Sequence, residues 1–104
     1  MAVNTTLLAR TAASTSSTTL YTQPSTSAIT VITNIAVTNT AATTASFTLS
    51  IGGVAIQSGS SIAGNSTAYL DLKQVIPASN PVKIVSGFAS TTAVNFHISG
   101  VEIV

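Results

Sequence analysis

The fold of this chain is decided by the stretch ASFTLSIGGVAI, residues 45–56. Apolar Phe47, Leu49 and Ile51 alternate with serine and threonine, and side chains in a β-strand point alternately to the two faces of a sheet. The pair Gly52-Gly53 follows, and glycine adopts the positive φ angles of a two-residue hairpin turn at little cost. The stretch therefore predicts a β-hairpin with one buried face and one solvated face.

The same two-residue period continues outward from this hairpin. Further strands are expected at residues 18–22, 29–39, 67–72, 82–86, 93–99 and 101–104. Turn signals separate them, such as Pro24, Gly64-Asn65 and the two prolines at 77 and 81. About eight short strands without helical periodicity predict an all-β antiparallel β-sandwich, either a jelly roll or immunoglobulin-like. Periodicity does not encode strand order, so both topologies stay open.

The strand at residues 29–39 has an irregular pattern. Its apolar residues Ile29, Val31, Ile35 and Val37 are expected on one face, and Ile32 is expected on the other. This pattern predicts either a β-bulge or a strand that is buried on both faces.

Residues 1–17 differ from the rest and are predicted to form an extended N-terminal arm, with the sandwich domain at residues 18–104. The segment has too few large apolar groups to offset the entropy of ordering it alone. An extended segment of this length reaches on the order of 50 Å, enough to cross a neighbouring subunit. Leu7, Leu8 and Arg10 are the predicted partner-binding residues. The alternative is a disordered tail.

The composition excludes several classes of function. Only 5% of the 104 residues are charged, the net charge is +1, and there is no cysteine. We therefore expect no nucleic-acid binding, no binding to anionic membranes, no disulfides and no thiolate metal site. The first ten residues resemble no secretory signal, and no apolar run is long enough to span a bilayer, so a soluble protein made and assembled in the cytoplasm is expected.

Candidate catalytic residues are few. His97 is the only histidine, and Asp71 and Glu102 are the only carboxylates, so a triad would need His97 as base beside one of them. His97 is expected on the outward face of its strand, and no nucleophile-elbow motif surrounds any serine. Asp71 is more simply explained as a solvated or salt-bridged partner of Lys73. The sequence predicts that the protein is not an enzyme and holds no cofactor or metal.

Two tyrosines, Tyr21 and Tyr69, are candidates for stacking on sugar rings. Carbohydrate sites usually combine several exposed aromatic residues with acids or amides, and this chain has only two tyrosines and three phenylalanines. Structural packing is the simpler interpretation of both.

The strands lack the charges that protect sheet edges in monomeric β-proteins. Residues 29–39 and 45–51 contain no charge, and residues 101–104 contain only Glu102. These strands are either central or covered by partners, and the segment 1–17 could supply a strand to a neighbour by β-augmentation. An obligate homo-oligomer or a lattice component fits this composition best.

Several segments resemble small virion proteins of tailed bacteriophages. They are residues 20–24 (LYTQP), 35–40 (IAVTNT), 50–53 (SIGG), 62–67 (IAGNST) and 95–102 (NFHISGVE). The resemblance covers most of the chain after Thr18 and consists of strand and turn patterns. It implies a β-sandwich that decorates the phage particle, brings no catalytic residues, and does not distinguish the head from the tail.

The leading prediction is a capsid cement, or decoration, protein of the virion. It would bind the major capsid protein and other copies of itself on the outer head surface and stabilise the shell. The alternatives are a tail, neck or baseplate component of the virion and a receptor- or glycan-binding fibre module. A hydrolase comes last.

Overall fold

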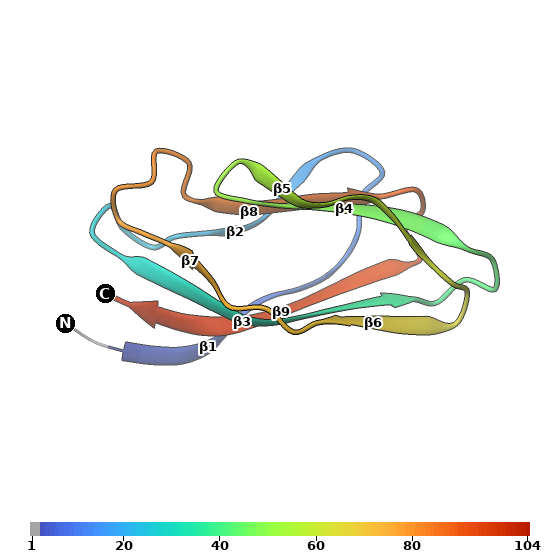
Figure 1. The fold of residues 1–104 in the computed structure, drawn as a ribbon, viewed down its shortest axis with the longest axis horizontal. Coiled ribbons are helices and arrows are strands. Elements are labelled where there is room, and N and C mark those ends of the chain that lie inside the picture. The colour runs from blue at the N-terminus through green and yellow to red at the C-terminus, as the bar shows by residue number, and fades with distance from the viewer. Residues whose placement is uncertain (1–2) are drawn as a thin grey trace.

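The computed structural model describes residues 3–104, which form nine β-strands and no helix (Figure 1). The strands are β1 (Val3–Ala12), β2 (Thr18–Thr22), β3 (Ile29–Asn39), β4 (Ala45–Ile51), β5 (Val54–Ile62), β6 (Ser66–Leu70), β7 (Gln74–Ile76), β8 (Ile84–Ala89) and β9 (Val94–Ile103). They build two antiparallel sheets that pack face to face, so the predicted all-β sandwich is confirmed. No helix in the described residues could span a membrane.

The strand order identifies the sandwich as a jelly roll. One sheet has the order β1-β9-β3-β6, with β7 also pairing β3, and the other has the order β2-β8-β4-β5. Apart from β7, the strands pair in a nested series: β1 with β9, β2 with β8, β3 with β6, and β4 with β5. Such nesting describes one long hairpin rolled into two sheets, which is the jelly-roll arrangement. The immunoglobulin-like alternative is therefore excluded.

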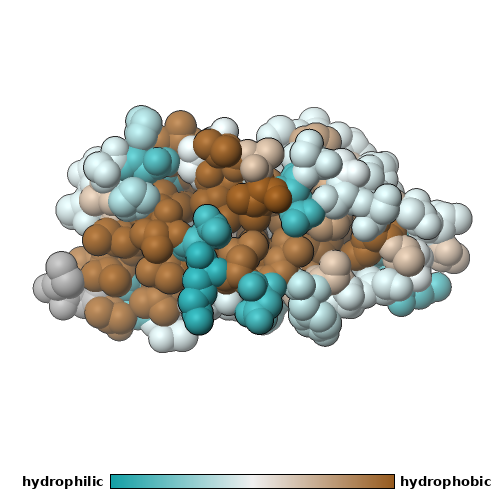
Figure 2. All heavy atoms as spheres, viewed as in Figure 1, coloured by the Kyte–Doolittle hydropathy of each residue, from teal (hydrophilic) through white to brown (hydrophobic). Residues whose placement is uncertain are grey.

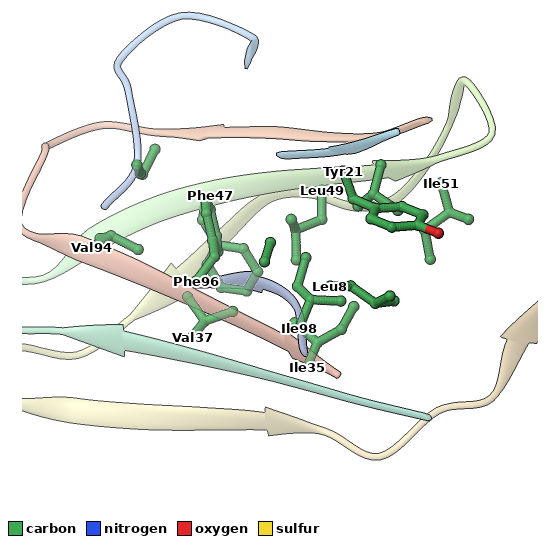
Figure 3. Close-up of a cluster of buried hydrophobic side chains, with 14 of the residues drawn as sticks. Leu8, Tyr21, Ile35, Val37, Phe47, Leu49, Ile51, Val94, Phe96 and Ile98 are labelled. Carbon is green, nitrogen blue, oxygen red and sulfur yellow. The ribbon is translucent and has the colours of Figure 1, made fainter. Parts of the chain in front are cut away.

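The core lies between the two sheets and consists of aliphatic side chains around two phenylalanines (Figure 3). Phe96 of β9 is fully buried and meets Phe47 of β4 across the interface, with ring centroids 6.3 Å apart and an interplanar angle of 66°. This edge-to-face geometry is the arrangement that aromatic pairs prefer. Leu49, Val37 and Ile98 are also fully buried around this pair.

The decisive hairpin is present at the predicted residues. β4 begins at Ala45 and ends at Ile51, and its burial alternates without a break. Gly52 and Gly53 have φ angles of +60° and +86°, the left-handed region that the turn requires. β5 continues to Ile62, further than the expected 54–56, because bulges allow its serine-rich second half to stay paired with β4.

The face assignment within β3 was partly wrong. A bulge between Ile32 and Asn34 shifts the register of β3 against β9. The extra residue moves Thr30 and Ile32 to the buried face and leaves Ile29 and Val31 on the outer face. The predicted bulge is therefore confirmed, but it exchanges the two faces in the first half of the strand.

The structure places residues 3–12 in the sandwich rather than in a projecting arm. They form β1, an edge strand that pairs with β9 from Val3↔Ile103 to Ala12↔Asn95. The opposite end of the chain supplies the pairing partner, and the sequence alone does not reveal a pairing across that separation. Residues 13–17 connect β1 to β2.

Candidate interaction surface

The most unusual surface of this molecule is the outer face of the sheet that contains β1, β9, β3 and β7. Register places residues side by side in rows across these strands, and each row lies on one face. Val3, Ile103 and Ile29 form one row. Thr5, Val101, Val31 and Val75 form another. The intervening row contains the fully buried Thr30, so these two rows point away from the core.

We call the aliphatic side chains of this region the outer apolar patch. It consists of Val3, Leu7, Ile29, Val31, Val75, Val101 and Ile103. Val3 is 66% exposed, Val75 is 55% exposed and Leu7 is 47% exposed, while the four central members are half-buried by their neighbours. Figure 2 shows the side of the sandwich, where hydrophobic side chains extend from the end with both termini to the middle of the molecule. An exposed apolar surface of this kind is a candidate interaction site.

A more polar row crosses the same face beyond the patch. Arg10, His97, Ala36 and Tyr69 are aligned on β1, β9, β3 and β6. Arg10 is exposed and Tyr69 is 72% exposed. The face is therefore divided into an apolar end near the termini and a polar end that carries one cation, one imidazole and one phenol.

The three predicted partner-binding residues have different environments, because β1 carries a bulge between Leu7 and Ala9. Leu7 is exposed and belongs to the outer apolar patch, and Arg10 is exposed in the polar row. Leu8 is 9% exposed and lies among the core side chains (Figure 3). Leu8 therefore contributes to the fold of its own chain, and Leu7 and Arg10 remain accessible.

Behind the patch, a polar cluster links the two sheets. The Tyr21 hydroxyl donates to Glu102 Oε2 at 2.5 Å and lies 3.0 Å from Thr30 Oγ1. The single phenolic proton goes to the carboxylate, so the Thr30 hydroxyl donates to Tyr21. Burial and the hydrogen bond to the Glu102 carboxylate raise the pKa of Tyr21 to about 12. Tyr21 is thus a packed structural residue and is not exposed for stacking on a sugar.

A second polar group lies in the interior near this cluster. Gln23 is 6% exposed, and its amide nitrogen donates to the carbonyls of Ala28 and Ile76 at 3.2 and 2.7 Å. Its Oε1 atom has no hydrogen-bond partner among the described residues. Gln23 connects the β2–β3 loop to β7, which holds Val75 at the margin of the patch.

The candidate catalytic residues do not converge. His97 points to the outer face, Glu102 is hydrogen-bonded to Tyr21 toward the interior, and Asp71 lies in the link between β6 and β7. Residues 3–104 contain no pocket and no cluster of three or more histidine, cysteine, aspartate or glutamate side chains that could hold a metal ion. The outer apolar patch is therefore the candidate site among the described residues.

Sequence reasoning missed most members of the outer apolar patch. Ile29 and Val31 were placed on the same face as Ile35 and Val37, because the bulge that separates them has no precise location in the sequence. Val75 belongs to β7, a three-residue strand that was not predicted. The segment 101–104 (VEIV) gave no signal for the patch, because Val101 and Ile103 alternate with Glu102 as in a strand with one wet face.

Comparisons with known proteins give no relative for this chain: no protein-family model matches it, and no curated protein sequence is significantly similar to it.

Proposed function

We propose that this protein is a virion structural protein of a tailed bacteriophage, a capsid cement protein that binds the outer surface of the head and stabilises the shell. The observation that carries the proposal is the outer apolar patch on one sheet face, in a chain with very few ionisable groups. In this proposal, the patch contacts the major capsid protein.

Physical arguments support a shell as the partner. The patch is small, so a single contact contributes modest affinity, whereas copies bound across a closed shell each connect subunits that would otherwise separate. The jelly roll is also an architecture of viral capsid domains, although it serves lectins and other proteins as well. Fold and surface together therefore favour assembly over catalysis.

Binding to purified heads that lack this protein tests the proposal. Val75→Lys introduces a charge into the patch on an exposed position of β7, and it is expected to weaken head binding at least tenfold. Val54→Lys is the matched control, because Val54 is 69% exposed on β5 of the other sheet. Equal binding by both variants would contradict the assignment of the patch.

Cryo-electron microscopy of the reconstituted particle gives the location. Copies distributed over the head are expected, with the outer apolar patch facing the shell. Copies confined to the tail, neck or baseplate would replace the cement proposal with the corresponding tail function.

A fibre module that binds a receptor glycan is the second candidate, and one observation favours it. Tyr69 is 72% exposed at the end of a row that also carries His97 and Arg10. A flat aromatic ring beside hydrogen-bond donors can stack on a sugar. Glycan-array binding that is lost in Tyr69→Ala and retained in Tyr69→Phe would support this candidate, and no binding by the unmodified protein would exclude it.

A further inference from the structure

The four sheet edges of this sandwich are protected to different degrees. β2 and β6 have five residues each, β7 has three, and Lys73 and Asp71 lie between β6 and β7. β5 is interrupted by bulges and by Gly59, which has a φ of +58°. Shortness, charge and bulges are the usual protections against edge-to-edge pairing. β1 has ten residues, and its first five, Val3 to Leu7, carry no charge, proline, glycine or bulge.

The backbone of this five-residue segment directs hydrogen-bonding groups away from β9 on one side. Among the described residues, the one side-chain contact to these groups is a long bond of 3.4 Å from the Thr6 hydroxyl to the carbonyl of Leu7. In an antiparallel pair, hydrogen bonding to a given neighbour alternates along the strand. The amide of Thr40 donates to Ala93 on the β3 side of the sheet, and the amide of Ala13 donates to Val94 on the β1 side. Even-numbered residues of β9 therefore face β1, and the register pairs them with Asn4 and Thr6. The N–H and C=O groups of Val3, Thr5 and Leu7 point to the open edge.

We propose that a second copy of this chain pairs with this edge, antiparallel, about a two-fold axis at Thr5. In this register Thr5 faces its own copy, and Val3 faces Leu7 of the second copy. All three residues have their backbone groups on the open side, so each pairing makes the reciprocal hydrogen bonds of an antiparallel ladder. The arrangement joins two five-stranded sheets into one continuous sheet with closed two-fold symmetry.

The side chains and the charges are compatible with this register. Val3 is 66% exposed and Leu7 is 47% exposed, and both lie on the outer face, so the pairing brings apolar groups together across the axis. The two outer apolar patches become continuous. Arg10 is the only charged residue of β1, and the two copies of Arg10 lie on the order of 30 Å apart, well beyond the screening length.

The register makes a specific cross-linking prediction. The chain has no cysteine, so a single introduced thiol reports one position. Across the axis the two Thr5 Cα atoms are about 5.5 Å apart, whereas the two Thr11 Cα atoms are separated by on the order of 40 Å. A short bifunctional thiol reagent is expected to link Thr5→Cys into dimers and to leave Thr11→Cys monomeric. Thr11 is the matched control because it is an exposed threonine of the same strand.

Sedimentation analysis of the full-length chain measures the dimer directly. Thr5→Pro removes an outward N–H without removing a bond to β9, and it is expected to raise the dissociation constant of the dimer about tenfold or more. Thr5→Val keeps the N–H and should dimerise normally. Circular dichroism of Thr5→Pro checks that the monomer stays folded. If this variant unfolds, the comparison of Thr5→Cys with Thr11→Cys decides whether the dimer forms at this edge.

A full-length chain that stays monomeric, or a dimer that links through position 11 and not through position 5, would overturn the proposal. Such a result leaves the proposed function standing, because head binding of Val75→Lys and Val54→Lys is measured separately. Failure of head binding with an intact Thr5-linked dimer would instead contradict the cement function alone.

Discussion

Asn39 shows how a single buried amide fixes the end of a strand. It is fully buried, and its Nδ2 atom lies within hydrogen-bond distance of the carbonyls of Thr43, Ile62 and Ala63, at 2.8, 3.2 and 3.3 Å. Its Oδ1 atom accepts from the amide of Ala41 at 3.0 Å. The side chain thus ties β3 to the loop that precedes β4 and to the end of β5. In a core without charged groups, such an amide supplies directional contacts that aliphatic packing lacks.

Replacing this amide by a carboxylate should be severely destabilising. Asn39→Asp keeps the shape and the acceptor for Ala41, but it points a buried negative charge at three carbonyl oxygens. We expect a loss of about 3 kcal/mol or more in the free energy of unfolding at neutral pH, with partial recovery at acidic pH, where the carboxyl is protonated. Urea denaturation at both pH values measures it. Asn34→Asp, at an exposed position of the same strand, is the control and should change little.

Tyr21 should make the stability of the fold depend on alkaline pH. Its pKa is raised from 10.0 to about 12, so the folded state favours the neutral phenol. The corresponding stability is complete below pH 10 and is lost as the pH rises through 12, and two units correspond to about 2–3 kcal/mol. Denaturant unfolding at a series of pH values measures the decline. In Tyr21→Phe this part of the decline should vanish, and an unchanged profile would contradict the role of the Tyr21–Glu102 contact.

Among the elements, β9 is the strand that pairs with both β1 and β3, and each of these two neighbours forms a bulge against it. β1 bulges between Leu7 and Ala9, opposite Ser99 and Ile98 of β9. β3 bulges between Ile32 and Asn34, opposite Gly100 and Ser99. Gly100 is buried where the backbone of β3 approaches closely. A residue without a Cβ allows the backbone of β3 to approach at its bulge. The two bulges change the alternation of faces along β1 and β3, so that Leu7 and Val31 lie on the outer face.

Gly100→Ala should therefore disturb the whole sheet. A Cβ at this position would overlap the carbonyl oxygen of Val31 and lie 2.9 Å from Leu8 Cδ1. The clash is with backbone, which cannot rotate away, so we expect a loss of about 2–4 kcal/mol. Thermal unfolding measures the loss. Ser99→Ala, at the adjacent exposed position, is the control, and equal stability of the two variants would contradict the close approach.

The elements that the sequence predicts well are those whose structure depends on local pattern. β3 and β4 have the expected bounds because alternation and the Gly52-Gly53 turn are local signals. β1 and β7 were missed because each is a strand only through its partner, β9 or β3. The outer apolar patch could not be predicted for the same reason. Its residues come from four strands, and which residues face outward depends on the position of two bulges. Local sequence therefore predicted the sandwich but only Leu7 of the patch.

At the scale of the whole molecule, the chain closes on itself end to end. The first strand of the nested hairpin pairs with the last, so β1 covers the edge of β9 and adds Leu8, Ala9 and the nearby Ala13 to the core. The sandwich is long and thin, with extents of 45 × 23 × 18 Å. In so thin a sandwich, removal of one strand exposes a large share of the buried apolar surface. β1 is therefore part of the folded unit, as are the strands that the periodicity predicted.

Removing residues 1–17 tests this view against that of a separable arm. The shortened chain, beginning at Thr18, lacks one side of the β1–β9 ladder and leaves β9 as a long edge beside the fully buried Phe96 and Ile98. Loss of Leu8 alone is expected to cost about 2–4 kcal/mol, and the ladder adds to it. We therefore expect a much lower unfolding temperature or aggregation. Leu8→Ala in the full chain should show part of this loss, whereas Thr11→Ala, at an exposed position of the same strand, should leave the unfolding temperature nearly unchanged. If the shortened chain has the same unfolding temperature as the full chain, the sandwich forms without β1. Such a result would support the interpretation of residues 1–17 as a separable arm.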